Sequence, residues 1–372
     1  MSWIPESPMP PELKNKVDFR DVNFRSLIDN HENFLHHRNR LQELGEGAVK
    51  TPLKVRYSFS FVLPQPQVAL PGSRPLPPFA HLTDIPLTVR LERRFKGNLQ
   101  DLVWLCTVDH DTLKDSKDIR VIVKFIQPSM LRIPDSWHTY SIDKRSEPYI
   151  APSNLVISEQ TAYDKLVSLQ GGIVPRFYGA HKVIMPNDEV ATMLIIEYVE
   201  GITPKKFKEP HDIDTWQSEH HEKHIAKLQK GLVAAQRALA KIHASGVLHS
   251  DLNSDNIIII PSTTSHDAVS VTFINFGQSM WQEGSAADWA QASGKKLLFW
   301  TDVEILTRRF AHCCQTHDAV IKSWIARGGP GVCVGTKDTA GTGTDEVILM
   351  PIGAEDTTGI PEYIPRMVAI RE

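Results

Sequence analysis

The chain has 372 residues, of which 41% are hydrophobic and 23% charged, and its formal net charge at pH 7 is −3. This length fits one large domain or two of medium size, and the near balance of charge argues against broad nucleic-acid binding. No stretch approaches the roughly 18 apolar residues of a membrane span, so no membrane partner is expected. Four cysteines predict reduced thiols, and the N-terminus lacks the pattern of a signal peptide. We therefore expect an intracellular protein, cytoplasmic or nuclear.

Residues 1–86 form an N-terminal extension with a helix and a Pro-rich linker. Seven prolines between Pro64 and Pro86 indicate the irregular linker. The preceding helix is amphipathic and is expected to end at Gly45, because apolar residues recur at helical spacing, namely Phe24, Leu27, Ile28, Phe34, Leu35, Leu41 and Leu44. We expect this helix to dock on the rest of the protein, and binding of a partner is the alternative.

Residues 87–200 are predicted to be rich in strands. Arg90–Leu105 fits a first hairpin, in which Gly97 is the only glycine. The run Val121-Ile122-Val123-Lys124 is typical of a strand that ends in a lysine. A helix is placed at Ser158–Gln170, with Ser158 as a candidate cap and Glu159 in its first turn. The run Leu194–Gly201 fits a buried strand followed by a loop.

A long helix is predicted to open the next region, residues 201–327. Its apolar face recurs at steps of three and four residues, through Ile225, Leu228, Leu232, Ala235, Leu239 and Ile242. Gly246 is the expected C-terminal cap of this helix.

The most informative segment follows directly, at His249-Ser250-Asp251-Leu252-Asn253-Ser254-Asp255-Asn256-Ile257, and nineteen positions after Asn256 comes Asn275-Phe276-Gly277. Apolar runs at Ile257–Ile260 and Val269–Ile274 predict the two strands of a hairpin. Such a hairpin would bring Asn256 and Asn275 close together.

These two motifs resemble the catalytic loop H-x-D-L-x-x-x-N and the D-F-G of the protein-kinase-like superfamily. The resemblance covers about residues 90–312. It implies an α+β, bilobal fold with a small antiparallel-sheet N-lobe at 87–200 and a helical C-lobe at 201–327. In that family the loop aspartate orients the acceptor hydroxyl and takes its proton, which implies that Asp251 is the catalytic base. The resemblance further implies ATP and Mg²⁺ as cofactors, with Asn256 and Asn275 as the metal ligands.

Other roles carry over one residue at a time. Lys124 resembles the strand lysine that binds the α- and β-phosphates of ATP and pairs with a helical glutamate, here Glu159. Leu194–Gly201 resembles the strand and hinge that hold adenine, which implies that the backbone of Glu197 and Val199 binds the base, with Ile196 as gatekeeper.

Several departures from the family pattern bear on activity. Asn275 replaces the metal-binding aspartate and removes a negative charge where a hard cation would sit. Ser250 stands where regulated protein kinases carry arginine, and a small residue there is typical of aminoglycoside and choline phosphotransferases. No convincing Gly-rich loop or A-P-E motif is visible. Few residues follow Asp302, the expected start of a later helix, and residues 328–372 read as a flexible Gly/Thr-rich tail, so whether the C-lobe is complete stays open.

Three hypotheses follow. In the first, the protein transfers the γ-phosphate of ATP to a protein Ser/Thr hydroxyl, with activity weakened by Asn275. In the second, it is a pseudokinase that acts as a scaffold without catalysis. In the third, it phosphorylates a small molecule. The acceptor, or the binding partner, is not identified by the sequence.

Overall fold

The computed structural model describes residues 31–95, 102–113, 119–131, 152–204, 218–261, 269–281 and 306. The chain divides into two compact units. The first consists of Met1–Tyr198 and Phe276–Gln278, and the second of Val199–Asn275 and Ser279–Glu372. Among the described residues, no helix is both long and apolar enough to cross a membrane.

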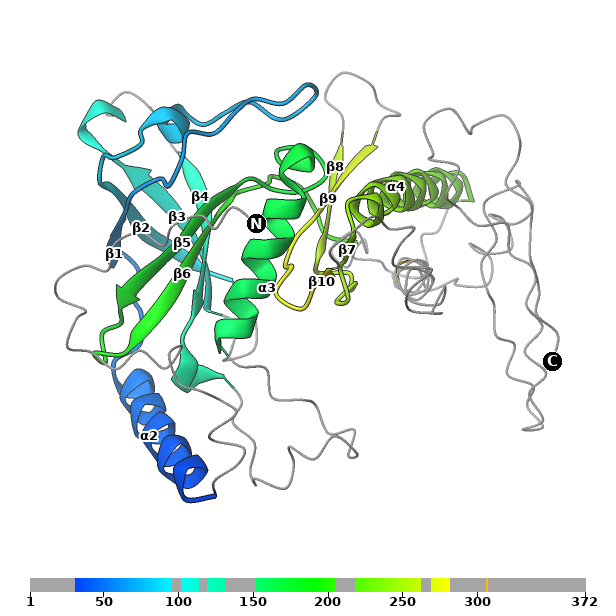
Figure 1. The fold of residues 1–372 in the computed structure, drawn as a ribbon. Coiled ribbons are helices and arrows are strands. Elements are labelled where there is room, and N and C mark those ends of the chain that lie inside the picture. The colour runs from blue at the N-terminus through cyan, green and yellow to red at the C-terminus, as the bar shows by residue number, and fades with distance from the viewer. Residues whose placement is uncertain are drawn as a thin grey trace, which may run out of the picture. The chain divides into compact units, whose positions relative to one another are not determined.

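The first unit is built on a six-stranded antiparallel sheet with strand order β1-β2-β3-β4-β6-β5 (Figure 1). Its strands are β1 (Ser58–Phe61), β2 (Leu87–Arg94), β3 (Leu102–Asp109), β4 (Arg120–Ile126), β5 (Phe177–Ile184) and β6 (Val190–Glu197). The antiparallel sheet expected for the small lobe is thus confirmed. The sheet also includes β1, which comes from the segment that the sequence assigns to the extension.

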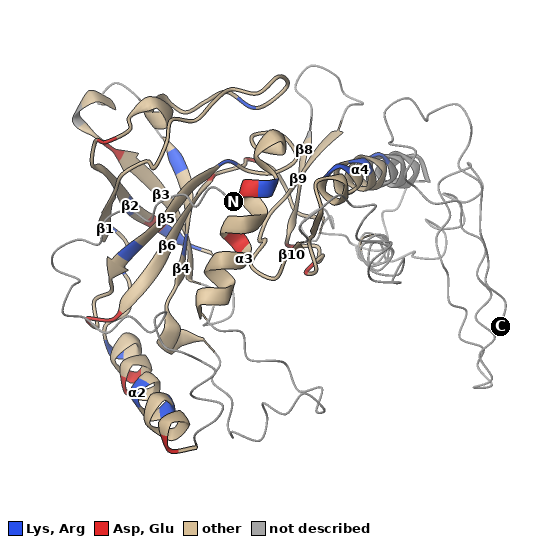
Figure 2. Ribbon diagram, viewed as in Figure 1, with Lys and Arg blue, Asp and Glu red and all other residues tan. Residues whose placement is uncertain are grey.

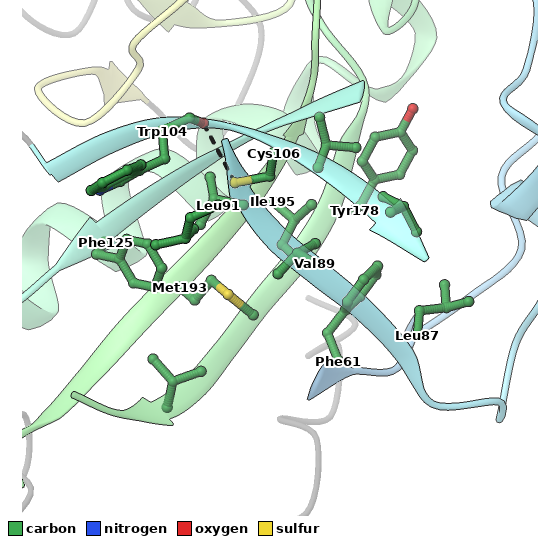
Figure 3. Close-up of a cluster of buried hydrophobic side chains, with 14 of the residues drawn as sticks. Phe61, Leu87, Val89, Leu91, Trp104, Cys106, Phe125, Tyr178, Met193 and Ile195 are labelled. Carbon is green, nitrogen blue, oxygen red and sulfur yellow. Dashed lines mark hydrogen bonds between the residues drawn. The ribbon is translucent and has the colours of Figure 1, made fainter. Parts of the chain in front are cut away.

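The alternation of apolar and polar residues along β2 explains why one face of the sheet is buried. Leu87, Val89 and Leu91 are fully buried, whereas the intervening side chains are more exposed. Figure 3 shows these three residues in a cluster with Trp104, Cys106, Phe125, Met193 and Ile195, among others. Burial raises the pKa of the Cys106 thiol, which is therefore a neutral part of the core.

The Pro-rich segment is packed against this core. It forms the 3₁₀ turn η3 (Pro78–His81), whose Phe79 and Ala80 are fully buried. The Phe79 ring meets Tyr178 edge to face, at 5.0 Å between centroids. A segment that buries a large aromatic side chain in this way is held against the core of the first unit.

The N-terminal helix α2 (His31–Lys50) passes through Gly45 and does not end there. A Cβ at Gly45 would lie 3.0 Å from the carbonyl oxygen of Ser129, so glycine lets the helix approach the turn η5 (Pro128–Met130) closely. The carbonyl of Leu44 accepts a hydrogen bond of 2.9 Å from Asn187 Nδ2. Basic and acidic residues are interspersed along the α2 ribbon (Figure 2). The expected docking of this helix is confirmed, although residues 24–30 of the predicted helix lie outside the described residues.

A buried carboxylate stabilises the surface on which α2 docks. Glu189 is 2% exposed. It accepts hydrogen bonds from Gln127 Nε2 at 2.7 Å, from Ser129 N at 2.8 Å and from the Ser129 hydroxyl. Asn187 Nδ2 donates to the same carboxylate, at 3.2 Å, and also to the helix. Because a buried charge is stable only when it is hydrogen-bonded, this cluster fixes η5 against the β5–β6 turn.

The helix that carries Glu159 is α3 (Pro152–Lys165), which begins and ends earlier than predicted. Proline is favoured in the first turn of a helix, where its missing N–H is not needed. At the other end Gln170 Nε2 donates to the carbonyl of Tyr163, at 2.9 Å, and so satisfies a group that the last turn leaves free. Gln170 thus caps the helix from outside and is not its final residue.

The second unit contains the long helix α4 (Ser218–Ala244), whose apolar face is buried from Leu232 onward, as predicted. Gly246 has φ 73°, and its N–H donates to His243 O at 2.9 Å, which confirms the expected cap. The strand β7 (Val247–Leu248) pairs with β10 (Met280–Trp281). The predicted hairpin is also present, as β8 (Ile257–Pro261) paired with β9 (Val269–Phe273). Gly97, Asp302 and the tail 328–372 lie outside the described residues.

One buried histidine in the first unit predicts an acid-sensitive fold. His181 on β5 is 5% exposed and packs against the Phe61 ring. Burial lowers its pKa from 6.5 to about 4, with a backbone hydrogen bond to Tyr178 opposing the shift only in part. The unfolded chain therefore binds a proton that the folded chain excludes. Stability should fall by about 3 kcal/mol as the pH drops from roughly 6.5 to 4.

The measurement is chemical denaturation at several pH values for the unaltered chain and for His181→Phe. We expect the variant to show a shallower loss of stability across this pH window, whatever its stability at pH 7. Equal slopes in the two proteins would assign the acid sensitivity to other groups.

Candidate functional site

Lys124 and Glu159 meet in the first unit, as the resemblance implies. Lys124 lies on β4 and Glu159 on α3, and their Nζ and Oε2 atoms are 2.8 Å apart. Glu159 is fully buried, and the Lys124 side chain is 17% exposed. Because an unpaired buried carboxylate is very costly, this ion pair fixes the lysine in one position. The binding of phosphates by Lys124 stays a prediction.

The end of β6 is held by a second ion cluster. The Glu197 carboxylate accepts from Arg74 Nε and Nη2, both at 2.9 Å, and from Arg176 N and Nη1, also at 2.9 Å. Its own backbone N–H donates to the carbonyl of Arg176 at 2.9 Å. Neither arginine was assigned a role from the sequence. Adenine binding by the backbone of Glu197 and Val199 stays a prediction.

In the second unit the predicted base and both predicted metal ligands are in direct contact. Asn256 Nδ2 donates to Asp251 Oδ2 at 2.9 Å and to Asp251 O at 2.7 Å. Asn275 Nδ2 donates to Asp251 Oδ2 and to Asn256 Oδ1, both at 3.2 Å. The hairpin brings this about, because Ile274 N donates to Asn256 O at 3.0 Å just after β9 ends. The expected proximity of Asn256 and Asn275 is confirmed.

His249 stabilises the loop through contacts with its backbone. It is fully buried, and its Nε2 lies 2.9 Å from the carbonyl of Ile274. Its Nδ1 accepts from Asp251 N at 3.4 Å. Because a neutral imidazole has one donor and one acceptor, these contacts place the proton on Nε2. The imidazole therefore links the residue that precedes Asn275 to the backbone of Asp251.

Two residues of this loop system adopt left-handed backbone conformations. Ser250 has φ 59° and Asn275 has φ 68°. Asparagine tolerates this region better than most residues, whereas serine is strained there by about 1 kcal/mol. The Ser250 hydroxyl is buried and has no hydrogen-bond partner among the described residues. Strain of this kind is common at functional sites, and glycine would relieve it.

This arrangement fits Mg²⁺ poorly. Mg²⁺ favours charged oxygen ligands, but here one carboxylate, that of Asp251, faces two neutral amides. The Asn275 N–H donates to the carboxylate, where a cation would otherwise supply positive charge. Within the described part of the chain, no group of three His, Cys, Asp or Glu residues could hold a metal ion. The metal roles of Asn256 and Asn275 stay predictions.

Phe276, the residue after Asn275, belongs to the first unit. It is fully buried, and its ring lies 5.4 Å from that of Tyr163 on α3. Tyr163 in turn stacks on Phe177 at 4.8 Å, with the two rings nearly parallel. Burial raises the pKa of the Tyr163 hydroxyl, and the nearby Glu159 adds to this shift. The helix that supplies Glu159 therefore also packs against the second residue of the Asn-Phe-Gly motif.

Sequence reasoning missed Asn253, Tyr163, Arg74 and Arg176. Asn253 had a usable signal, because an asparagine in a turn often accepts from the N–H groups that follow it. Its Oδ1 accepts from Asp255 N at 2.9 Å and from Asn256 N at 3.1 Å, while its Nδ2 donates to Asp251 Oδ1 at 3.2 Å. The two arginines offer no such local signal, because their shared partner Glu197 is distant in the sequence.

Comparison with known proteins gives fold-level likeness only. No family model and no curated protein sequence matches the chain. Among solved structures, the Cydia pomonella granulovirus kinase PK-1 is 13% identical with a TM-score of 0.32, over 52% of this chain and 55% of that one. WaaP in complex with acyl carrier protein is 10% identical with a TM-score of 0.33, over 63% of this chain and 84% of WaaP. This chain thus spans about half the length of the granulovirus kinase. Similarity at this level transfers no substrate and no residue role.

Proposed function

We propose that this chain is a divergent member of the protein-kinase-like superfamily that binds ATP and transfers its γ-phosphate slowly. The observation that supports this most strongly is the buried ion pair between Lys124 and Glu159. A lysine held by a fully buried glutamate next to an antiparallel sheet is the arrangement that orients ATP phosphates in this superfamily. The sequence order of Lys124, Glu159, Asp251 and Asn256 is also the family order.

Slow transfer follows from the contacts of Asp251. A catalytic base must accept a proton from the acceptor hydroxyl, yet its Oδ2 accepts from the amides of both Asn256 and Asn275. Donation from Asn275 and Asn256 occupies the oxygen that would otherwise accept from the acceptor hydroxyl. The Asn275 amide also removes a negative charge that would help to hold a cation on the phosphates. We therefore expect nucleotide binding to be better preserved than phosphoryl transfer.

The first test is thermal unfolding of the full chain with ATP, both with Mg²⁺ and with EDTA. A ligand present at about 100 times its Kd adds roughly 2.7 kcal/mol of stability. We expect ATP to raise the unfolding temperature even in EDTA, because Lys124 supplies positive charge without a metal. No shift at millimolar ATP in either condition would contradict the proposal.

The variant for this test must remove the lysine without leaving a buried charge. Lys124→Met alone strands Glu159, so the double variant Lys124→Met/Glu159→Met is the better comparison. Arg90→Ala is the matched control, because Arg90 forms an exposed ion pair with Asp109 on the same sheet. We expect the double variant to lose the ATP shift and Arg90→Ala to retain it.

A catalytically silent nucleotide-binding module is the second candidate, and donation from Asn275 to Asp251 favours it. Transfer of radiolabelled γ-phosphate to a pool of proteins and small metabolites separates the two candidates. Slow labelling that Asp251→Asn abolishes supports a transferase. ATP binding without any labelling that depends on Asp251 supports the silent module.

A further inference from the structure

The segment Ser73–Pro75 of the N-terminal extension is joined to the end of β6 by ion pairs and hydrogen bonds. Arg74 forms a two-pronged ion pair with Glu197, through Nε and Nη2, each 2.9 Å from a carboxylate oxygen. Its Nη1 donates to Gly172 O at 2.7 Å, and its backbone N–H donates to Gly171 O at 2.7 Å. One arginine therefore joins the extension, the β5–β6 pair and the turn before β5.

Arg176 completes the cluster from the other side. It is 2% exposed, and its Nη1 lies 2.9 Å from Glu197 Oε1. Its Nη2 donates to Ser73 Oγ at 3.1 Å and to the carbonyl of Arg74, and its Nη1 reaches Pro75 O at 3.3 Å. A buried arginine that binds carbonyls of the extension can be satisfied only while the extension is in place.

The surrounding backbone is shaped to admit this cluster. Gly171 has φ 75°, and a Cβ there would come within 2.6 Å of the Arg176 guanidinium. No other residue would fit at Gly171 without displacing the arginine. The Glu197 carboxylate is thus enclosed by two arginines and a glycine turn. An exposed surface ion pair needs no such packing, and exposed pairs contribute little to stability.

We propose that Arg74 is a positioning residue for recognition of the adenine base, acting through Glu197. This inference rests on the proposed binding of ATP and on the expectation from the sequence that the backbone of Glu197 and Val199 binds adenine. Glu197 is the last residue of β6, so the two arginines anchor the strand at the point where the chain leaves it. The planar, two-pronged pairing of arginine with a carboxylate fixes orientation as well as distance. Removing Arg74 frees one side of this anchor, while Arg176 still pairs with the carboxylate.

The experiment compares two ligands that share a triphosphate but differ in the base. Calorimetry in EDTA measures the affinity of the full chain for ATP and for inorganic tripolyphosphate. For Arg74→Ala we expect ATP affinity to fall by about tenfold or more, the scale of indirect coupling between groups, with tripolyphosphate affinity unchanged. Arg74→Lys should fall between, because lysine keeps the charge but loses the second prong. Arg90→Ala, which removes an exposed arginine far from this cluster in sequence, should leave both affinities unchanged.

Each outcome decides the matter. A selective loss of ATP affinity supports the proposal. Equal loss for both ligands, or no loss for either, assigns Arg74 a structural role only and overturns it, while leaving ATP binding itself intact. Absence of ATP binding in the unaltered chain overturns the proposed function and this inference together. Circular dichroism and the unfolding temperature establish whether Arg74→Ala is folded. If it is not folded, Arg74→Gln replaces it in the same affinity measurements.

Discussion

Replacing Lys124 with methionine is expected to destabilise the first unit by about 3–5 kcal/mol, the cost of breaking a buried ion pair from one side. The reason is the environment of Glu159, which has no exposed surface and whose Oε1 has no hydrogen-bond partner among the described residues. Without the Nζ atom 2.8 Å from Oε2, the carboxylate must either stay charged in a dry site or take up a proton. Either course costs folding free energy at neutral pH.

The measurement is urea denaturation of the unaltered chain, Lys124→Met, and Lys124→Met/Glu159→Met. We expect the double variant to recover most of the lost stability, because replacing both partners of a buried pair with apolar residues is often neutral. If the single and double variants lose the same stability, the pair contributes little and the buried charge is not the cause.

The second large effect is expected for Asn275→Asp. Asn275 Nδ2 lies 3.2 Å from Asp251 Oδ2 and 3.2 Å from Asn256 Oδ1, so the change sets a carboxylate oxygen against two acceptors. Loss of this donor should cost about 1–3 kcal/mol at pH 7 in the absence of divalent cations. The backbone itself should tolerate the change, because aspartate, like asparagine, accepts the left-handed conformation at φ 68°.

Mg²⁺ should reverse this loss in the variant and have little effect on the unaltered chain. Thermal unfolding with Mg²⁺ or EDTA measures both, and a γ-phosphate transfer assay on the same samples shows whether activity rises with metal binding. Asn275→Ala is the control, since it removes the donor without adding charge and should not respond to Mg²⁺. If the unaltered chain itself needs Mg²⁺ for stability, the amide does not replace a cation in this loop.

Local patterns in the sequence were sufficient for the elements that hold the site. The strand before Lys124, the hairpin that joins Asn256 to Asn275 and the cap at Gly246 all follow from runs of a few residues, and all are present. Helix ends were less predictable, because they depend on distant groups. The turn η5 packs so closely against α2 that position 45 needs a glycine. In the sequence Gly45 therefore predicts the end of the helix, whereas in the structure it lies inside the helix and contacts η5.

The cluster around Glu197 could not be predicted for the same reason. Its members come from positions 74, 176 and 197, and only folding brings their charges together. A Pro-rich segment predicts an irregular linker because proline disfavours regular structure, but it says nothing about what the irregular backbone packs against. Charge pairing over such separations leaves no spacing pattern in a single chain.

The placement of Phe276 has a consequence for how the protein is made. The first unit consists of residues up to Tyr198 together with Phe276–Gln278, and Phe276 supplies a ring against Tyr163. During synthesis this unit therefore stays incomplete until the ribosome has passed residue 278, whereas domains generally fold as they emerge. Until then the Phe276 ring that packs against Tyr163 is missing, so we expect the Tyr163–Phe177 pair to be incompletely covered in the nascent chain.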